Sequence, residues 1–520
     1  MAASIVLTGL SANYAVPGNF LEILFAQGLI GGYQGQRPMC LIGNKTTAGT
    51  ATLDTVVYGP DTPVPCQTEQ DVITLFGAGS ELHRGWLRTS PILKAGVPVY
   101  MIAVTPSGGV AATKIVTLLT VPLSGGSWRI FVGDDFVDVG FATGDTLASI
   151  TANAVSLINA KLRWAVTASQ TTVTTTSDSI TLTAKNLGPR GNWLRAMAMI
   201  VPGSSGVSVG TTTTITADAF FTGGTTADSN VTALATLSTR KMYYCVQAAE
   251  DATQAGALST QINSMALPVT GIRQRGFIGS VDTQSNVNTI AVGLNSPRME
   301  VVWQKAGVLT PFELACAAAA VYALQENSGD KPMCNFSGYP RNASEQATWL
   351  VPPPRDQTAN PSPAGQNIAL LNGVTPIAVS PQGTSTYIVK RITSKSLTGA
   401  NQDYRVRDAH KVTVPDFFGD DYLARVGAQL GGKNLVDDPK QGQPQPPRDT
   451  TTPSRLRALA VTLIEDYGPN GKSLLQRTAD TYADMIVQRE ASNANRLSAS
   501  IPLFVCDILD QTASQILQVG

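Results

Sequence analysis

Histidine limits the catalysis that this chain could perform, because the sequence holds only two, His83 and His410. Ser80 precedes His83 by three residues, so the two would lie one helical turn apart, as a nucleophile and its base could. The segment lacks Gly-x-Ser-x-Gly, and no acid-His-Ser order is suggested. We therefore expect structural histidines and assign no catalytic residue.

Two further segments could hold a ligand. Residues 468–473, Gly-Pro-Asn-Gly-Lys-Ser, look like a phosphate-binding loop, but their glycines are too close for G-x-x-x-x-G-K-[ST]. A turn after a helix at 453–467 explains them better. Asp134 and Asp135 could ligate a cation, yet hairpin-turn residues are the simpler interpretation. No G-x-G-x-x-G follows the strand pattern at 242–246, which leaves a dinucleotide site without support.

The cysteines favour neither metal nor disulfide. They are scattered without CxxC spacing, and several stand in apolar runs, where cysteine behaves as a small hydrophobic residue. The six are Cys40, Cys66, Cys245, Cys316, Cys334 and Cys506. We expect free thiols in a reducing compartment, and no cofactor.

Composition points away from a nucleic-acid or membrane-surface binder. The 520 residues carry 37 basic and 37 acidic side chains and a formal net charge of zero, so no basic field attracts phosphates. Charged residues are only 14 % of the chain, whereas about a quarter is usual, which indicates surface hidden against partners. We find neither a leader pattern nor an apolar run of about 18 residues. The expectation is a soluble, cytoplasmic protein that associates with itself.

Strand and helix patterns alternate along much of the chain, which predicts a parallel sheet covered by helices. Thr310, Pro311 and Glu313 supply an N-cap, a first-turn proline and a capping-box acid for an alanine-rich helix. Strand patterns cover 39–42, 97–104, 242–246, 277–280 and 299–303, and helix patterns cover 69–76, 253–265, 284–293 and 311–325.

Composition changes near Ser107, where threonine, glycine and alternating patterns begin. Strand patterns at 128–132 and 136–139 flank the turn 133–135, which predicts a hairpin. A helix pattern at 147–158 follows, and 211–215 suggests another edge strand. This stretch is typical of a self-contained β-rich insertion.

Further strand patterns occur at 373–380, 384–393, 485–489 and 497–501, and 439–453 is a proline- and glutamine-rich loop. The fold class that we predict is multidomain α/β with extended terminal arms. Its expected parts are an N-terminal arm (1–35), the first part of the α/β core (36–106), the β-rich insertion (107–222), the rest of the core (223–372), an α+β C-terminal domain (373–511) and a C-terminal strand (512–520).

Both ends of the chain carry short strand patterns. These are Ile5, Val6 and Leu7 at the start and Ile516, Leu517 and Val519 at the end. The pattern alone leaves two interpretations open. Either the segments complete the chain's own sheets, or each adds as a strand to the sheet edge of another subunit.

Several strings, in their order along the chain, resemble the tail sheath proteins of the Mu-like branch of contractile phages. They are residues 76–84 (Phe-Gly-Ala-Gly-Ser-Glu-Leu-His-Arg), 96–100 (Gly-Val-Pro-Val-Tyr), 180–192, 221–224 (Phe-Thr-Gly-Gly) and 487–497. Each string is weakly specific alone, whereas their order covers nearly the whole chain. The resemblance implies a subtilisin-like α/β core without protease chemistry.

The resemblance also implies a function. Copies would form stacked rings around a tail tube, and the terminal strands would join a sheet of neighbouring C-terminal domains beyond about Gly373. The insertion would point outward and the C-terminal domain inward, with the helix at 453–467 offering tube-facing candidates. Those candidates are Arg455, Arg457, Glu465 and Asp466.

The implied partners are further copies, the tube protein, and baseplate and tail terminator proteins, with no direct nucleic acid or membrane. The implied location is the virion tail, assembled in the cytoplasm of a host bacterium. Two alternatives stay open: the sheath of a related injection system (a tailocin or a secretion system), and an α/β hydrolase.

Overall fold

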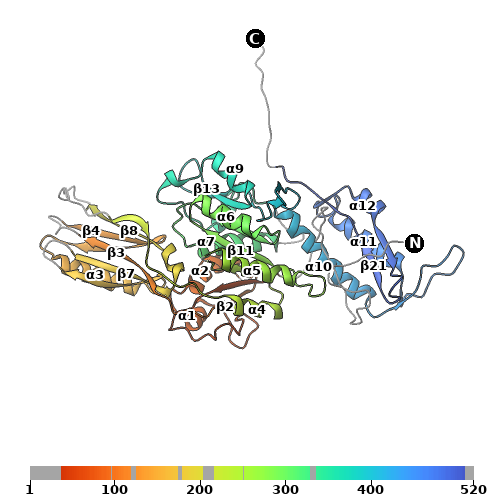
Figure 1. Cartoon of the computed structure of the whole chain (residues 1–520), viewed down its shortest axis with the longest axis horizontal. Helices are drawn as coiled ribbons and strands as arrows, with labels where there is room; N and C mark the ends of the chain where they lie inside the picture. Colours follow the sequence, from red (N-terminus) through yellow and green to blue (C-terminus); the bar gives the residue numbers. More distant parts are fainter. Residues whose placement is uncertain are drawn as a thin grey trace, which may run out of the picture.

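The computed structural model describes residues 37–94, 96–118, 125–173, 178–202, 216–249, 251–327 and 335–509. The molecule is elongated and has three parts in a row (Figure 1). A β-rich part lies at one end, a helix-covered sheet in the middle, and a mixed C-terminal part at the other end. The terminal segments that carry the expected exchange strands, including Ile5 and Ile516, lie outside the described residues, as do 211–215.

The central part is a seven-stranded sheet in the order β14-β13-β12-β11-β10-β1-β2. All strands from β13 to β2 are parallel, and only β14 is antiparallel, which confirms the predicted parallel sheet. The strands are β1 (Met39–Gly43), β2 (Val99–Ala103), β10 (Tyr244–Gln247), β11 (Arg275–Ser280), β12 (Met299–Trp303), β13 (Val374–Val379) and β14 (Thr386–Ile388).

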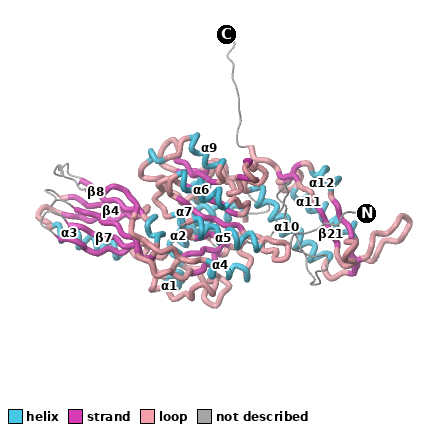
Figure 2. Tube along the Cα trace, viewed as in Figure 1, coloured by secondary structure: helices cyan, strands magenta, loops and turns pink. Residues whose placement is uncertain are grey.

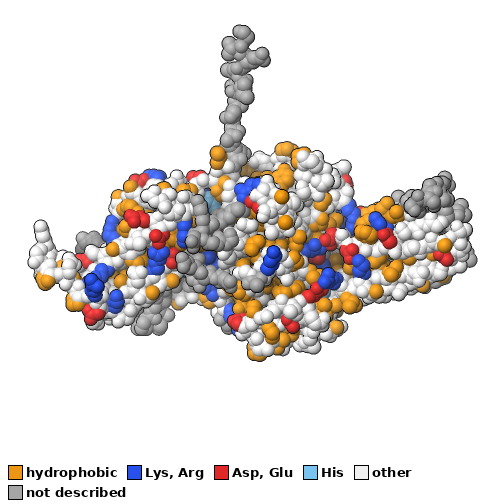
Figure 3. All heavy atoms as spheres, turned by 180° about the vertical axis from the view of Figure 1, so that it is seen from behind, with side chains coloured by type: hydrophobic (Ala, Val, Ile, Leu, Met, Phe, Trp, Pro, Cys, Tyr) orange, Lys and Arg blue, Asp and Glu red, His pale blue; other side chains and the backbone are white. Residues whose placement is uncertain are grey.

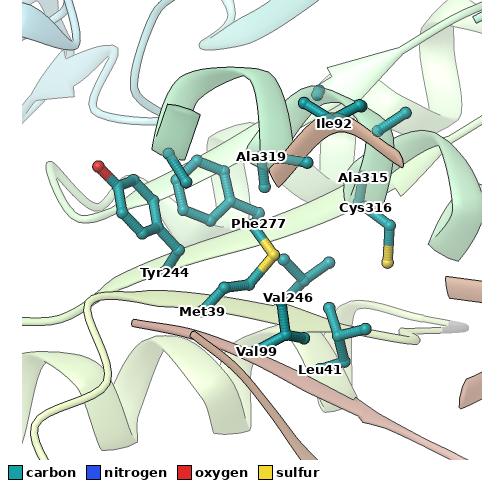
Figure 4. Close-up of a cluster of buried hydrophobic side chains, with 14 of the residues drawn as sticks. Met39, Leu41, Ile92, Val99, Tyr244, Val246, Phe277, Ala315, Cys316 and Ala319 are labelled. Carbon is teal, nitrogen blue, oxygen red and sulfur yellow. The ribbon is translucent and has the colours of Figure 1, made fainter. Parts of the chain in front are cut away.

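Helices cover both faces of this sheet, because alternate strand residues point to opposite faces. Met39 and Leu41 pack under α1, α2 and α7, whereas Cys40 and Ile42 face α4, α5, α6 and α9. Figure 4 shows strand residues gathered beneath α7. The helices are α1 (Glu69–Phe76), α2 (Glu81–Leu93), α4 (Val231–Ala235), α5 (Ala252–Met265), α6 (Gln284–Leu294), α7 (Pro311–Glu326), α8 (Ala343–Thr348) and α9 (Pro363–Leu371).

The start of α7 has the predicted capping box. The Thr310 hydroxyl accepts from the backbone N–H of Glu313, whose carboxylate accepts from the backbone N–H of Thr310. Small side chains let α7 lie close to its neighbours: its alanines are buried, and Gly85 of α2 faces Phe312 so closely that a Cβ there would lie 2.6 Å from the ring. This helix is therefore fixed against both α2 and the sheet.

The β-rich part packs a four-stranded sheet (β5-β4-β8-β9) against a three-stranded sheet (β3-β7-β6) and the helix α3. The predicted hairpin is confirmed, since β4 and β5 pair from Gly126↔Phe141 to Val132↔Asp135, and so is the helix at 147–158. The elements are β3 (Ala111–Leu118), β4 (Gly126–Val132), β5 (Asp135–Phe141), α3 (Leu147–Ala160), β6 (Val166–Val173), β7 (Asp178–Leu187), β8 (Arg195–Pro202) and β9 (Thr216–Phe220), with a 3-10 turn at Pro189–Trp193.

The C-terminal part joins two long helices to short, separate strand pairs (Figure 2). The predicted helix at 453–467 and the strands near 485–489 and 497–501 are confirmed. The elements are β15 (Leu397–Thr398), β16 (Asn401–Gln402), α10 (His410–Leu430), β17 (Asn434–Leu435), β18 (Thr450–Thr451), α11 (Pro453–Tyr467), β19 (Leu475–Gln476), α12 (Thr478–Asp484), β20 (Ile486–Arg489), β21 (Leu497–Ser500) and β22 (Phe504–Val505).

Two features differ from the sequence expectation. The core does not end at residue 372, because β13 and β14 extend the central sheet to Ile388. The strand pattern at 373–380 matches β13, whereas that at 384–393 contains only the three-residue β14; both belong to the central sheet, which only their long-range pairing shows. The helix α10 was not predicted, because Pro415 and several charged residues interrupt its apolar pattern.

Candidate functional site

His83 is buried, and both of its ring nitrogens have partners. Nδ1 accepts from the backbone N–H of Gly79 at 2.9 Å, and Nε2 lies 3.2 Å from Oε1 of Glu69. The Ser80 hydroxyl instead caps α2, where it accepts from the backbone N–H of His83 at 3.1 Å. Burial lowers the pKa of His83, and the Glu69 hydrogen bond opposes this only in part. These contacts support a structural histidine.

His410 stands at the first residue of α10 and is 5 % exposed. Burial lowers its pKa to about 4. Two ion pairs lie around it: Lys390 with Asp408 at 2.9 Å, and Lys411 with Asp507 at 2.6 Å. A neutral imidazole among paired charges fits a structural role.

The titration of His410 makes stability depend on pH. The unfolded chain binds this proton near pH 6.5 and the folded chain only near pH 4, so the stabilisation present above pH 6.5 is lost as the pH falls through that window. We expect the free energy of unfolding to drop by about 2 to 3 kcal/mol between pH 7 and pH 4.5 from this group. Urea unfolding across that range measures it. In His410→Gln the free energy of unfolding should depend less on pH, by the share that His410 contributes. If the free energy of unfolding falls equally with pH in both proteins, His410 is not the group responsible.

The glycine-containing segment at 468–473 is a closed turn after α11. The backbone N–H groups of Gly471 and Ser473 both donate to the Gly468 carbonyl, and that of Lys472 donates to the Asp466 carbonyl. The ammonium of Lys472 bonds the Tyr467 hydroxyl and lies 3.9 Å from the centre of its ring. The amides that would cradle a phosphate are thus used within the turn.

Other candidates for ligand chemistry are also paired. Asp134 binds Arg88 at 2.6 Å, and Asp135 accepts from Lys161 at 2.9 Å and from the Trp164 indole at 2.8 Å. Burial raises the pKa of the Cys66 thiol to about 12. Within the described ranges, no three His, Cys, Asp or Glu side chains gather as a metal site requires. None of the helices that the structure describes has the length and apolarity to cross a membrane.

The crevice in which open α/β sheets usually bind ligands is filled by the chain itself. Such crevices lie at the carboxyl ends of the strands where the strand order reverses, here between β1 and β10. Arg190 of the β-rich part enters there, donating to the Ala248 carbonyl at 3.0 Å and bonding Asp228, which also accepts from Asn44 at 2.6 Å. A cavity of about 10 Å³ beside Arg190 has room for one water molecule.

Further ion pairs extend this contact, which we term the β-rich joint. Besides Arg190–Asp228, it contains Arg88–Asp134 and a bidentate pair of Arg163 with Glu69 at 2.7 and 2.5 Å. Asp218 of β9 binds Arg195 at 3.0 Å and Arg355 at 2.8 Å. Because the pairs of Arg190, Asp134, Arg163 and Asp218 join different elements of the β-rich part to the core, they fix its orientation there.

A second joint lies at the amino ends of the parallel strands, where α10 packs. Arg298 binds Asp416 through two hydrogen bonds of 2.9 Å, and the Tyr243 hydroxyl donates to the same carboxylate at 3.1 Å. One turn further, Asp420 binds Arg273 and, at 2.6 Å, Lys241. We term these contacts the α10 joint; they tie the C-terminal part to the central sheet.

The α10 joint continues into a buried network centred on Glu300, which is 0 % exposed. Its carboxylate bonds Arg275, and Arg391 at 2.8 and 2.9 Å. Arg391 also bonds Glu326, which accepts from the Tyr244 hydroxyl at 2.5 Å. Arg275 in turn bonds Thr413 of α10. Sequence reasoning missed these residues, although Glu300 stands inside the strand pattern at 299–303, where a buried charge requires a partner.

Three of the four tube-facing candidates on α11 are held within the chain. Arg455 donates to the carbonyls of Pro446 and Pro447 at 2.7 and 2.8 Å. Arg457 donates to the Met485 carbonyl at 2.6 Å, and Asp466 accepts from Arg425 at 2.6 Å. Glu465 is exposed.

Comparison with solved structures finds similar chains, among them two sheath tail proteins. One, from Desulfitobacterium hafniense, has a TM-score of 0.43 and 11 % identity, covering 95 % of this chain and all of the other. The second, from Listeria innocua, has a TM-score of 0.44 and 12 % identity, covering 92 % of this chain and 94 % of the other. No protein-family model matches the chain. No curated protein matches its sequence.

Proposed function

We propose that this chain is a structural subunit of a contractile phage tail sheath, of the Mu-like kind, which polymerises with copies of itself around a tail tube. The observation that carries the proposal is the strand pair β20–β21 in the C-terminal part. A two-stranded sheet is only marginally stable by itself, and its outer backbone groups can pair with another chain. Within the described residues, β21 pairs with β20 alone.

The edges of the central sheet are different. Bridges Leu53↔Ala103 and Tyr58↔Met101 cover the outer side of β2, and Tyr339↔Ile388 covers β14. Among the described residues, both edges of the large sheet are thus covered, whereas no further strand pairs with β21. This contrast supports strand addition by a second copy, for which Ile5–Leu7 and Ile516–Val519 remain the proposed donors.

The charge distribution supports polymerisation as well. Several charged side chains are buried in the β-rich joint and the α10 joint, and on the face drawn in Figure 3 blue and red groups are scattered among larger white and orange areas. With a net charge of zero, copies meet without long-range repulsion. The two joints also favour movement of each subunit as one body.

In the proposed mechanism the extended array is metastable, and a baseplate signal releases it into a shorter, wider packing with more contact. Exchanged strands would hold neighbours together while the bodies slide. The β-rich part would face outward and the C-terminal part the tube protein. Baseplate and terminator proteins would bound the array in the virion tail, assembled in the host cytoplasm.

Negative-stain electron microscopy of the purified chain at high concentration tests the proposal first. Hollow, striated cylinders are the expected result. Particles that stay monomeric in varied salt and with tube protein added would overturn it.

A proline at Ala499 tests the β21 edge. The backbone N–H of Glu490 donates to the backbone carbonyl of Arg496. Hydrogen-bonded and non-hydrogen-bonded residue pairs alternate along an antiparallel ladder, so Ala499, opposite Val487, is in a non-hydrogen-bonded pair and its N–H points away from β20. Ala499→Pro therefore removes an outward donor without breaking the hairpin, and we expect a folded protein, by circular dichroism, that no longer polymerises. Cylinders of normal length from Ala499→Pro would show that β21 accepts no strand.

Deleting residues 512–520 tests the proposed donor strand, and it should also give a folded protein that no longer polymerises. If that deletion unfolds the chain, the strand belongs to the subunit's own core instead.

A further inference from the structure

The loop at residues 437–449, which we term the proline loop, projects from the end of the molecule opposite the β-rich part (Figure 1). It has no helix or strand, and nearly all of its residues are exposed. Between Lys440 and Arg448 it carries no charge, only glutamine, glycine and proline. No role in the proposed strand exchange uses these residues.

Both stems of the proline loop are anchored. On the first, Asp437 pairs with Arg489 at 3.0 Å, and Asp438 accepts from the backbone N–H of Ser454 at 3.1 Å. On the second, Arg455 holds the carbonyls of Pro446 and Pro447. The short parallel pair β17–β18 closes the base. A loop fixed in this way presents its tip in a defined place.

The prolines restrict the backbone of the tip. Pro444, Pro446 and Pro447 have fixed φ angles, and each residue before a proline is held in an extended conformation. Such a segment favours polyproline II, in which residues three apart share a face. Pro444 and Pro447 are both exposed, while Pro446 is half-buried against Arg455. The tip thus offers one apolar ridge at little further entropic cost.

The position of the proline loop indicates its partner. Its first stem is tied through Arg489 to the end of β20. The proposed strand addition is on β21 of the same hairpin, so a copy that pairs there would approach the end of the molecule that carries the loop. We propose that residues 441–447 bind a surface groove on a second copy of this chain, next to the strand-exchange site; the inference rests on the proposed function.

Photo-crosslinking of the full-length chain tests the contact. Benzoyl-phenylalanine at Gln443 should give covalent dimers on a denaturing gel after irradiation of assembled protein, and none from unassembled protein. The same residue at Asn153, on the exposed side of α3, controls for random collision. Polymers without a dimer above this control would overturn the inference and leave the proposed function intact. An absence of polymers would overturn both.

A second measurement tests the ridge itself. Replacing Pro444 and Pro447 with serine should raise the monomer concentration that coexists with polymer about tenfold. Without these prolines the loop tip of the unassembled chain has more backbone freedom to lose on binding, and its apolar face is lost. Pro439→Ser, at the half-buried base of the loop, is the matched control. An unchanged monomer concentration in the double variant would contradict a role in assembly.

Discussion

Replacing Glu300 with glutamine is expected to lower the free energy of unfolding by about 3 to 5 kcal/mol, the cost of breaking a buried ion pair from one side. The carboxylate is fully buried and pairs with both Arg275 and Arg391, of which Arg391 also pairs with Glu326. Glutamine has nearly the same volume, so the loss comes from charge and not from packing. Arg275 would then lose the carboxylate that it pairs with, and Arg391 would keep only Glu326.

Urea unfolding of both proteins measures the change. Asp138→Asn is the matched control, because Asp138 forms an equally well-formed pair with Arg129 on the surface of the β-rich part. That pair is about a third exposed, and we expect its loss to cost less than about 1 kcal/mol. Equal losses in the two variants would mean that the Glu300 network does not hold α10 and the sheet together.

The sequence predicts well those features that depend on nearby residues. The capping box at Thr310 and Glu313 and the hairpin turn at Gly133 are short patterns with one favourable geometry each. The parallel sheet follows from strand and helix alternating along the chain. In each case the partners are close in sequence, or the pattern repeats.

The contacts between residues far apart in the chain could not be predicted from the sequence. Arg298 meets Asp416 across 118 residues, and Arg190 meets Asp228 only because the β-rich part returns beside β1. Arg455 and Arg457 are tube-facing candidates because of the family resemblance, and the structure adds that nearby carbonyl groups hold both guanidinium groups. One sequence shows that an arginine is present, but not whether another part of the chain will pair with it.

The same reasoning explains why both joints use arginine. Its planar group binds two carboxylate or carbonyl oxygens at once, so each contact fixes an orientation as well as a distance. Apolar contacts alone would allow the parts to slide. In a subunit proposed to move as one body, the joints contribute geometry more than stability.

Gly279→Ala is expected to have an effect of similar size by a different route. Gly279 lies in β11 beneath the start of α7, and a methyl group there would stand 1.9 Å from the Pro311 carbonyl oxygen and 3.2 Å from the Ala315 nitrogen. Both neighbours are backbone atoms, so no side chain can move aside. Overpacking usually costs about 1 to 3 kcal/mol, and we expect the upper end or more.

The added methyl group should push the start of α7 away from β11, and this shift should also disturb the β-rich joint. The first turn of α7 holds Glu313, which binds Arg84 at 2.9 Å and lies near Arg88, the partner of Asp134. Limited proteolysis should therefore release the β-rich part sooner in Gly279→Ala. Gly293→Ala provides the control, because Gly293 is exposed in α6 with open space around it. Alanine there should raise the free energy of unfolding by about 0.5 to 1 kcal/mol. If Gly279→Ala lowers the free energy of unfolding and Gly293→Ala raises it, the loss at Gly279 comes from the close approach of α7 to β11 and not from the replacement of glycine itself.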